Sequence, residues 1–284
     1  MKYLLSIVLL STLNLNAQKL TEIWEVEGLE APESIVYDSN SDVYYVSNVS
    51  GQPAEKNGKG FISIVNSSGE LKTKQWITGF NAPKGLGLYY NHLFIADIDQ
   101  VVVVDVIKGE IIKRFNAEGA TFLNDIDISS DGSVYVSDTF GGNAIYKIKD
   151  DTITLWLKSE DLNFPNGLEI VNNKLYVSSW GVVTNPETFG TEVPGKLIEV
   201  DINTKEIKTL TKSIGNLDGL VAVNNGFIVS DWIDGSLLSI DKSGNSSKIK
   251  DLDAGSADFY YNLTERIILI PIMLENKLLA FKIN

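Results

Sequence analysis

The 284-residue chain has no cysteine and a single histidine, His92. The absence of cysteine excludes disulfides, thiolate nucleophiles and a lipid-modified cysteine. One histidine cannot build a histidine-ligated zinc site, and His92 falls in a turn between two expected strands, which argues against a Ser-His-Asp triad. The fold must therefore be held together by apolar burial and strand pairing, and its chemistry must use other side chains.

Basic residues are scarce relative to acidic ones: 24 Lys and Arg stand against 37 Asp and Glu, for a net charge of −13. Such a balance argues against nucleic acid as a partner, because phosphate binding needs a basic surface. It keeps the protein soluble and concentrates cations near its surface. With 44% hydrophobic residues the chain has enough apolar side chains for a sizeable folded core.

Long hydrophobic runs are missing except at the start, where Lys2 precedes an apolar stretch over residues 3–13. This pattern predicts a secretory signal peptide over residues 1–17, followed by one domain over residues 18–284. The run is short for a transmembrane helix, which needs about 20 apolar residues. We expect an exported, periplasmic or secreted protein with no membrane attachment in its mature form. An uncleaved N-terminal anchor is the alternative.

A repeat is present instead. Successive segments combine an apolar strand, a turn rich in Asn, Asp, Ser or Gly, and a second strand that ends in a small and a polar residue. They are PESIVYDSNSDVYYVSN from Pro32, PKGLGLYYNHLFIAD from Pro83, LNDIDISSDGSVYVSD from Leu123, PNGLEIVNNKLYVSS from Pro165, LDGLVAVNNGFIVSD from Leu217 and, more loosely, ADFYYNLTERIILIPI from Ala257. A period of about 40 to 50 residues indicates a repeat fold.

Two further strand-like runs follow each hairpin, so the sequence predicts an all-β, six-bladed β-propeller with four antiparallel strands per blade. The last repeat supplies only three strands, the final one over residues 277–283. The orphan strand over residues 20–26 should pair with it, which closes the last blade and removes an exposed edge. A β-sandwich is the competing fold, but it does not explain six repeats of one period.

Polar residues recur at the start of the expected inner strands, where a propeller would gather them at one mouth of its central channel. They are Glu33, Lys84, Asn124, Asn166, Asp218 and Asp258. In contrast, Asp97, Asp138 and Asp231 end the second strands, and their recurrence predicts structural hydrogen bonds. The six polar residues at the starts of the inner strands would form a ring at the channel mouth. Two long linkers, residues 49–60 and 181–195, should lie on the same face as this ring.

Four short motifs in this phase, PES from Pro32, LND from Leu123, PNG from Pro165 and LDG from Leu217, resemble those of the SMP-30/gluconolactonase/luciferin-regenerating-enzyme family of six-bladed propellers. The resemblance runs from about Glu30 to the C-terminus. It implies that Glu33, Asn124, Asn166 and Asp218 surround a catalytic divalent cation, usually calcium.

The residue types agree with this implication, since two carboxylates and two amides offer only oxygen ligands, which a hard cation such as Ca²⁺ prefers. Four ligands do not fill the coordination sphere of calcium, so water or substrate would complete it. The alternative is that these Asn and Asp side chains only satisfy backbone groups in turns.

Two departures from the family bear on the substrate. Phe122 stands where gluconolactonases often carry an arginine two residues before the ligand asparagine, and Ile272 lies where phosphotriesterase members often place a histidine. A more apolar substrate than a sugar lactone is therefore expected. The predicted substrate-contacting residues are Lys84, Phe122, Asp125, Trp180, Trp232 and Asp258, with Phe140 as a further wall residue.

These features predict a monomeric, calcium-dependent hydrolase that acts on a lactone or related ester, with Asp218 as the catalytic residue that activates water. Two alternatives stay open. One is a non-catalytic propeller that binds a ligand or a protein, and the other is a phosphotriesterase-like hydrolase.

Overall fold

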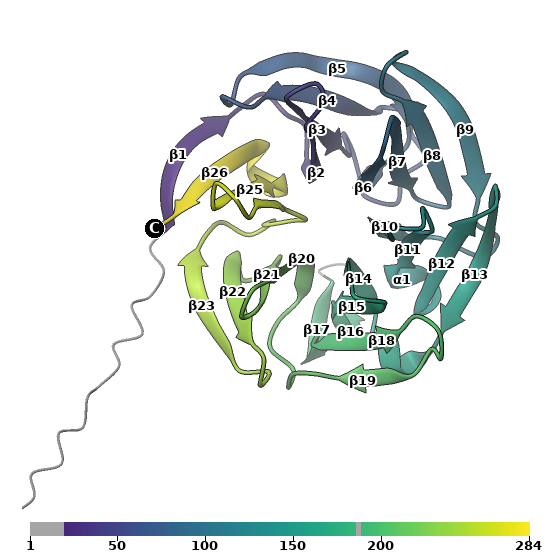
Figure 1. Cartoon of the computed structure of the whole chain (residues 1–284), viewed down its shortest axis with the longest axis vertical. Coiled ribbons are helices and arrows are strands. Elements are labelled where there is room, and N and C mark those ends of the chain that lie inside the picture. The colour runs from purple at the N-terminus through teal and green to yellow at the C-terminus, as the bar shows by residue number, and fades with distance from the viewer. Residues whose placement is uncertain (1–19, 186–188) are drawn as a thin grey trace, which may run out of the picture.

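The computed structural model describes residues 20–185 and 189–284, so the predicted signal peptide over residues 1–17 lies outside the described residues. Six four-stranded antiparallel sheets stand around a common axis, as in a six-bladed β-propeller (Figure 1). This confirms the predicted fold class. No helix in the described ranges has the length and apolar character needed to cross a membrane.

The first three blades follow one another along the chain, each with its first strand innermost. Blade 1 holds β2 (Pro32–Asp38), β3 (Val43–Asn48), β4 (Gly60–Asn66) and β5 (Leu71–Phe80). Blade 2 holds β6 (Pro83–Tyr89), β7 (His92–Asp97), β8 (Gln100–Asp105) and β9 (Glu110–Asn116). Blade 3 holds β10 (Leu123–Ile128), β11 (Val134–Asp138), β12 (Ala144–Lys149) and β13 (Thr152–Lys158), with the short helix α1 (Thr139–Gly142) after β11.

The other three blades complete the circle. Blade 4 holds β14 (Pro165–Val171), β15 (Lys174–Ser179), β18 (Leu197–Asp201) and β19 (Ile207–Thr209), and it is preceded by the 3-10 turn η1 (Glu160–Leu162). Blade 5 holds β20 (Leu217–Val223), β21 (Gly226–Asp231), β22 (Ser236–Asp241) and β23 (Ser246–Asp251). Blade 6 holds β24 (Tyr260–Asn262), β25 (Ile267–Ile272), β26 (Lys277–Ile283) and β1 (Leu20–Val26), with η2 (Met273–Glu275) between β25 and β26.

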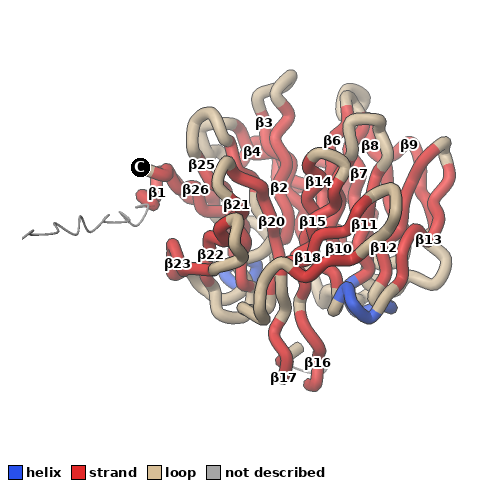
Figure 2. The backbone as a smooth tube through the Cα atoms, turned by 60° about the horizontal axis from the view of Figure 1, so that its bottom comes forward, coloured by secondary structure: helices blue, strands red, loops and turns tan. Residues whose placement is uncertain are grey.

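Blade 4 carries an insertion between its second and third strands. The strands β16 (Gly181–Asn185) and β17 (Gly190–Pro194) pair as a separate hairpin, which projects from one face of the propeller (Figure 2). The loop over residues 49–59 occupies the same place in blade 1. Both insertions join second to third strands, as the sequence predicts, because added residues at that position leave the blade hydrogen bonds intact.

The chain closes through blade 6. β1 pairs antiparallel with β26, and the register places Leu20 opposite Ile283 and Val26 opposite Leu278. Leu20 and Val26 are buried, and the two strands lie side by side near the C-terminus (Figure 1). The predicted closure by the orphan strand is therefore confirmed, with both strands at their predicted bounds.

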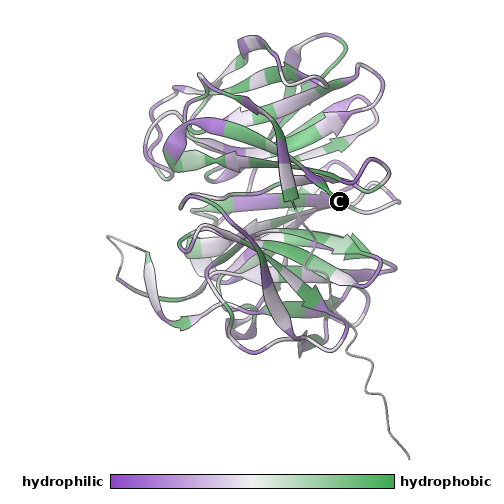
Figure 3. Ribbon diagram, turned by 90° about the vertical axis from the view of Figure 1, so that its left-hand side faces the viewer, coloured by the Kyte–Doolittle hydropathy of each residue, from purple (hydrophilic) through white to green (hydrophobic). Residues whose placement is uncertain are grey.

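Hydrophobic clusters fill the spaces between adjacent blades. One of them joins Val101 and Phe115 of blade 2 to Ile126, Val136 and Tyr146 of blade 3. Along the strands hydrophobic and hydrophilic segments alternate, whereas turns are often hydrophilic (Figure 3). Successive side chains of a strand point to opposite faces of its sheet. The hydrophobic side chains therefore pack against a neighbouring blade.

Buried and half-buried carboxylates bridge inner strands that share no backbone ladder. Asp125 and Asp127 of β10 accept the amides of Leu168 (2.6 Å) and Ile170 (2.5 Å) of β14. Glu169 of β14 accepts the amide of Ala222 of β20 at 3.2 Å. Adjacent inner strands of a propeller expose unpaired amides to the channel, and buried amides of this kind need an acceptor. These acidic residues supply it.

Glu169 provides a pH-dependent test of this arrangement. Burial, and then the charge of Asp127, raise the pKa of Glu169 to about 8. A raised carboxyl pKa stabilises the folded protein at low pH, and this contribution is lost as the pH rises from the unfolded value of 4.5 toward 8. The variant Glu169→Gln keeps an acceptor oxygen for Ala222 but cannot ionise.

We therefore expect Glu169→Gln to match the wild type in stability at pH 5 and to exceed it at pH 9, by up to about 4 kcal/mol. Chemical denaturation of both proteins across this pH range measures the difference. Parallel stability curves for the two proteins would show that Glu169 does not resist ionisation.

Candidate functional site

Hydrogen bonds at the ends of the second strands fix the backbone that leads into the ring of inner-strand residues. In blades 1 to 3 an acidic or amide side chain at that end accepts a backbone amide just ahead of the inner strand. The bonds join the amides of Glu30, Ala82 and Phe122 to Asn48, Asp97 and Asp138 at 2.9, 2.8 and 2.8 Å. The predicted structural role of Asp97 and Asp138 is confirmed, and the bonds hold Glu33, Lys84 and Asn124 at the channel mouth.

Glycines allow the inner strands to approach closely at this mouth. A Cβ atom at Gly167 would overlap the carbonyl oxygen of Asp218, and one at Gly219 would lie 2.8 Å from the Cα of Asp258. The glycines of the PNG and LDG motifs are thus required by the convergence of blades 4, 5 and 6, and a side chain there would push the ring residues apart.

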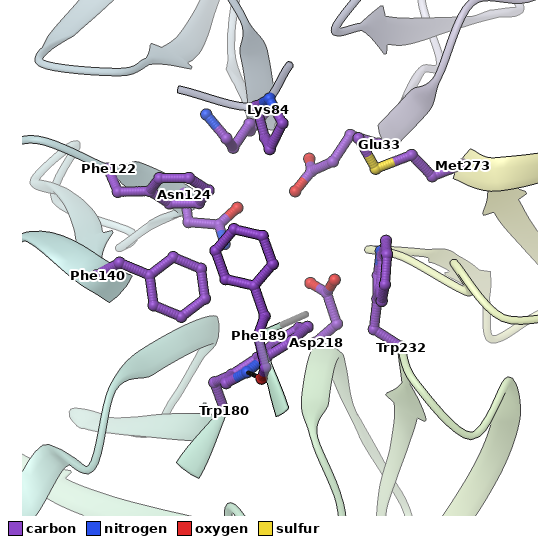
Figure 4. Close-up of a pocket in the computed structure, with 11 residues that line it drawn as sticks. Glu33, Lys84, Phe122, Asn124, Phe140, Trp180, Phe189, Asp218, Trp232 and Met273 are labelled. Atoms are coloured by element: carbon purple, nitrogen blue, oxygen red, sulfur yellow. Dashed lines mark hydrogen bonds between the residues drawn. The ribbon is translucent and has the colours of Figure 1, made fainter. Parts of the chain in front are cut away.

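The ring opens into a cavity of about 80 Å³ on the axis of the propeller. Its floor presents Glu33, Asn124 and Asp218, whose side-chain oxygens point toward a common centre (Figure 4). Its walls are apolar. They consist of Pro53, Phe122, Phe140, Trp180, Phe189, Trp232 and Met273, and Lys84 also lines the cavity.

Two oxygens of the floor are buried and have no hydrogen-bond partner among the described residues, Glu33 Oε2 and Asn124 Oδ1. The Asn124 amide is held in this orientation because its Nδ2 donates to Thr139 Oγ1 (3.2 Å) and to Asn166 Oδ1. Asn166 is itself fixed by donating to the Leu217 carbonyl at 3.1 Å. A buried oxygen without a donor carries a free-energy cost, and a ligand at the centre would relieve it.

The electrostatics of the floor favour a cation. Burial raises the pKa of Glu33 well above its usual value, and the neighbouring charges of Asp218 and Asp258 raise it further. Burial likewise raises the pKa of Asp218, with added contributions from Asp258 and Asp231. Each carboxylate is hard to ionise while the other is charged, and a divalent cation between them would reverse this balance.

Lys84 is the basic residue of the cavity. It is 2% exposed, donates to the Ala82 carbonyl at 3.2 Å, and holds its ammonium 4.4 Å from the ring centre of Phe122. Burial lowers the pKa of Lys84 to about 8, although Glu33, Asp97 and Asp138 favour its charged form. Lys84 lines the cavity, and no ion pair within the described ranges includes it.

The kinds of oxygen at the floor of the cavity indicate which metal ion would fit there. Among the described residues no three His, Cys, Asp or Glu side chains are arranged to hold a metal ion. The floor instead combines two carboxylates with amide oxygens, and amide oxygens are suitable ligands for Ca²⁺. The two partnerless oxygens fit a hard cation, and Asn166 stands behind Asn124 with its oxygen already accepting one bond.

Aromatic rings pack against one another along part of the cavity wall (Figure 4). Phe140 contacts four of them, with ring centres 4.7 Å from Phe122, 5.7 Å from Trp180, 5.1 Å from Phe189 and 6.2 Å from Phe164. Trp180 in turn lies 5.9 Å from Trp232. Such a wall excludes water and suits an apolar portion of a ligand.

The structure brings most of the predicted site residues together. Those that line the cavity are Glu33, Lys84, Phe122, Asn124, Trp180, Asp218 and Trp232. Asn166 is buried beside Asn124 rather than at the cavity surface. Asp125 and Asp258 are not among the lining residues, because Asp125 accepts the amides of Ile126 and Leu168 and Asp258 accepts the Ser34 hydroxyl at 2.6 Å.

Three lining residues were not predicted from the sequence: Pro53, Phe189 and Met273. Met273 directly follows the second strand of blade 6, as Trp180 and Trp232 do in blades 4 and 5, so the repeat phase contained the signal for it. Pro53 and Phe189 belong to the two long insertions, which have no counterpart in the other blades and hence no periodic signal.

No protein-family profile matches the chain, and no curated protein matches it in sequence. Among solved structures, the chain is similar to a gluconolactonase from Xanthomonas campestris, with a TM-score of 0.71 and 13% identity over 95% of each chain. It is also similar to virginiamycin B lyase from Staphylococcus aureus, with a TM-score of 0.64 and 12% identity over 92% of this chain and 99% of the lyase.

A third similar structure is a chain of a nidogen/laminin complex, with a TM-score of 0.58 and 16% identity over 80% of this chain and 88% of the other. At these identities the likeness shows a shared propeller fold. The gluconolactonase likeness agrees with the resemblance of the PES, LND, PNG and LDG motifs.

Proposed function

We propose that this protein is a divalent-cation-dependent hydrolase of a lactone or related ester. The observation that carries the proposal is the pair of buried, partnerless oxygens, Glu33 Oε2 and Asn124 Oδ1, which face the Asp218 carboxylate across a cavity with apolar walls. The oxygens provide a place for a cation on one side of the cavity, and the apolar walls provide a place for an apolar substrate on the other. It is supported by the fold that the chain shares with a gluconolactonase.

Glu33, Asn124 and Asp218 would hold the cation, most simply Ca²⁺, and Asn166 would position Asn124 from behind. When bound, the cation would polarise the substrate carbonyl and stabilise negative charge on its oxygen. The amide hydrogen bonds of Asn124 and Asn166 fix these oxygens before any ligand arrives, which lowers the cost of organising the site.

Asp218 is suited to accept a proton from the attacking water, because its carboxylate lines the cavity beside the oxygens that would hold the cation (Figure 4). Water then adds to the carbonyl carbon, the bond from that carbon to the ester oxygen breaks, and the proton passes to the leaving oxygen. A lactone would give a hydroxy acid. The carboxylate product would lie within reach of the Lys84 ammonium at the cavity wall.

The site supports hydrolysis better than it supports a lyase reaction like that of the similar virginiamycin B lyase. A histidine-to-alanine variant of that lyase is described as catalytically inactive. The only histidine of this chain is His92, at the exposed start of β7, whereas the ring lies at the opposite end of that strand. None of the described residues that line the cavity is a histidine.

The apolar run at residues 3–13 supports the further proposal that the enzyme works outside the cytoplasm, where millimolar calcium would be available to a site of modest affinity. Secretion of a reporter fused to residues 1–17 would test it. Retention of that reporter in the cytoplasm would contradict it.

Activity and calcium dependence can be tested together. We expect turnover within a panel of lactones, aryl esters and organophosphates, abolished by chelator and restored by calcium. Calcium should also raise the melting temperature, because a ligand at a hundredfold excess over its Kd stabilises the folded state by about 2.7 kcal/mol. Reductant should have no effect, since the chain has no cysteine.

The outcomes separate the candidate functions. Turnover of organophosphates alone would identify a phosphotriesterase. Calcium binding without turnover of any compound would favour a non-catalytic binding propeller. A melting temperature that is flat across a calcium titration would contradict the cation site itself.

A further inference from the structure

A second hollow lies beside the cavity on the same face of the propeller, between blades 2 and 3. This outer groove has a volume of about 480 Å³ and is lined by Ala54, Lys56, Ile98, Asp99, Ala120, Thr121, Phe122, Phe140 and Phe189. Three of these residues, Phe122, Phe140 and Phe189, also line the cavity, where Figure 4 shows their rings. The groove is therefore continuous with the wall of the site.

The chemistry of the groove is mainly apolar. Ile98 and Ala120 are buried in its wall, and the small side chains of Ala54 and Ala120 leave room beside the Phe122 and Phe140 rings. Ile98 adopts a φ of 60°, which is rare for a β-branched residue and is held here by the bond from the Leu123 amide to the Ile98 carbonyl at 2.7 Å. The wall is thus firmly positioned.

Charge appears only toward the outside. Lys56 of the blade 1 insertion forms an ion pair with Asp99 at 2.5 Å, and both side chains are partly exposed. This pair ties the insertion to the loop after β7 and forms the outer border of the groove. An occupant would meet the apolar wall next to the cavity and a polar border farther out, with no unpaired charge between them.

We propose that the outer groove binds an extended apolar substituent, an alkyl chain or an aryl group, carried by the lactone or ester whose reacting carbonyl lies in the cavity. The inference rests on the proposed hydrolase function. It names the substrate class as lactones or esters with an apolar tail, and it makes Thr121, Ala120 and Ile98 specificity-determining residues. One molecule would occupy both spaces if its tail ran over Phe122 and Phe140, whose rings line both.

The test uses two ligand series and a matched pair of variants. One series is p-nitrophenyl esters with acyl chains from acetyl to decanoyl. The other is γ-lactams with alkyl tails from methyl to decyl, which resist hydrolysis and whose binding is measured by tryptophan fluorescence, since Trp180 and Trp232 lie in the cavity wall. Thr121→Trp fills the groove from an exposed position, and Glu118→Trp places the same side chain on the same loop outside it.

In the wild type we expect lactam affinity and ester kcat/KM to rise about two- to fourfold per added methylene until the groove is full. Thr121→Trp should flatten this dependence, whereas Glu118→Trp should keep it, with both variants melting as the wild type does. Equal affinity for short and long tails would overturn the proposal that the groove binds the tail. An equal loss of the length dependence in Thr121→Trp and Glu118→Trp would overturn it too. Length-dependent lactam binding without turnover of any ester would overturn the hydrolase function and leave the groove as a binding site.

Discussion

Replacement of Asp218 by asparagine should lower kcat at saturating calcium by about two to four orders of magnitude. The variant keeps an oxygen that can hold the cation but loses the negative charge and the proton acceptor. Calcium should bind more weakly and still saturate, and the fold should be retained, because Asp218 faces the cavity rather than an interface between blades. Calcium titration by calorimetry and steady-state kinetics on the same preparation measure both effects.

Asn166→Asp is the contrasting variant. It adds a charge beside Asn124 and keeps the oxygen that accepts from Asn124, but it loses the hydrogen bond that Nδ2 donates to the Leu217 carbonyl. Calcium binding should persist, and the loss of rate should be smaller than for Asp218→Asn. If Asp218→Asn turns over substrate normally once calcium is saturating, Asp218 is only a ligand. Glu33 would then be the first carboxylate to test as the base, because it faces the same cavity.

A large loss of stability is expected for Val26→Asp in the closing strand. Val26 is 4% exposed and belongs to a cluster with Leu29, Ile35 and Leu278, so a carboxylate there is either buried or forces β1 away from β26. We expect the free energy of unfolding to fall by about 3 to 5 kcal/mol, with aggregation through the uncovered edge of β26.

Ile23→Asp is the matched control in the same strand. Ile23 is 44% exposed and sits at the irregularity between Glu22 and Trp24, where it has no partner in the register. The same substitution there should change stability by no more than about 0.5 kcal/mol. Similar denaturation midpoints for Val26→Asp and the wild type would mean that β1 does not hold the propeller closed.

The fold could be predicted closely because its signal is periodic. Each hairpin repeats the same alternation and the same turn chemistry. At Asn172 and Asn173, for example, both residues have positive φ, as the tight turn between β14 and β15 requires. The closing strand could also be predicted, since six repeats with three strands in the last one leave a single orphan strand to complete it.

The site could be predicted only where it follows the repeat. Glu33, Asn124 and Asp218 start inner strands, so their shared phase in the repeat is enough to bring them to one mouth of the channel. Phase alone could not separate them from Asp258, whose carboxyl group accepts the Ser34 hydroxyl. Which oxygens of a ring stay without a partner depends on distances between blades, and these follow from packing.

The sequence by itself thus determined the six-bladed propeller, its closure and the ring of polar residues at one mouth of the channel. Local alternation and turn residues encode strands, and a fixed period encodes their circular arrangement. Only the tertiary structure decided that Pro53 and Phe189 reach the cavity and that Phe122, Phe140 and Ile98 form a groove beside it. Insertions and inter-blade spaces are shaped by contacts between segments far apart in the chain, which no periodic pattern records.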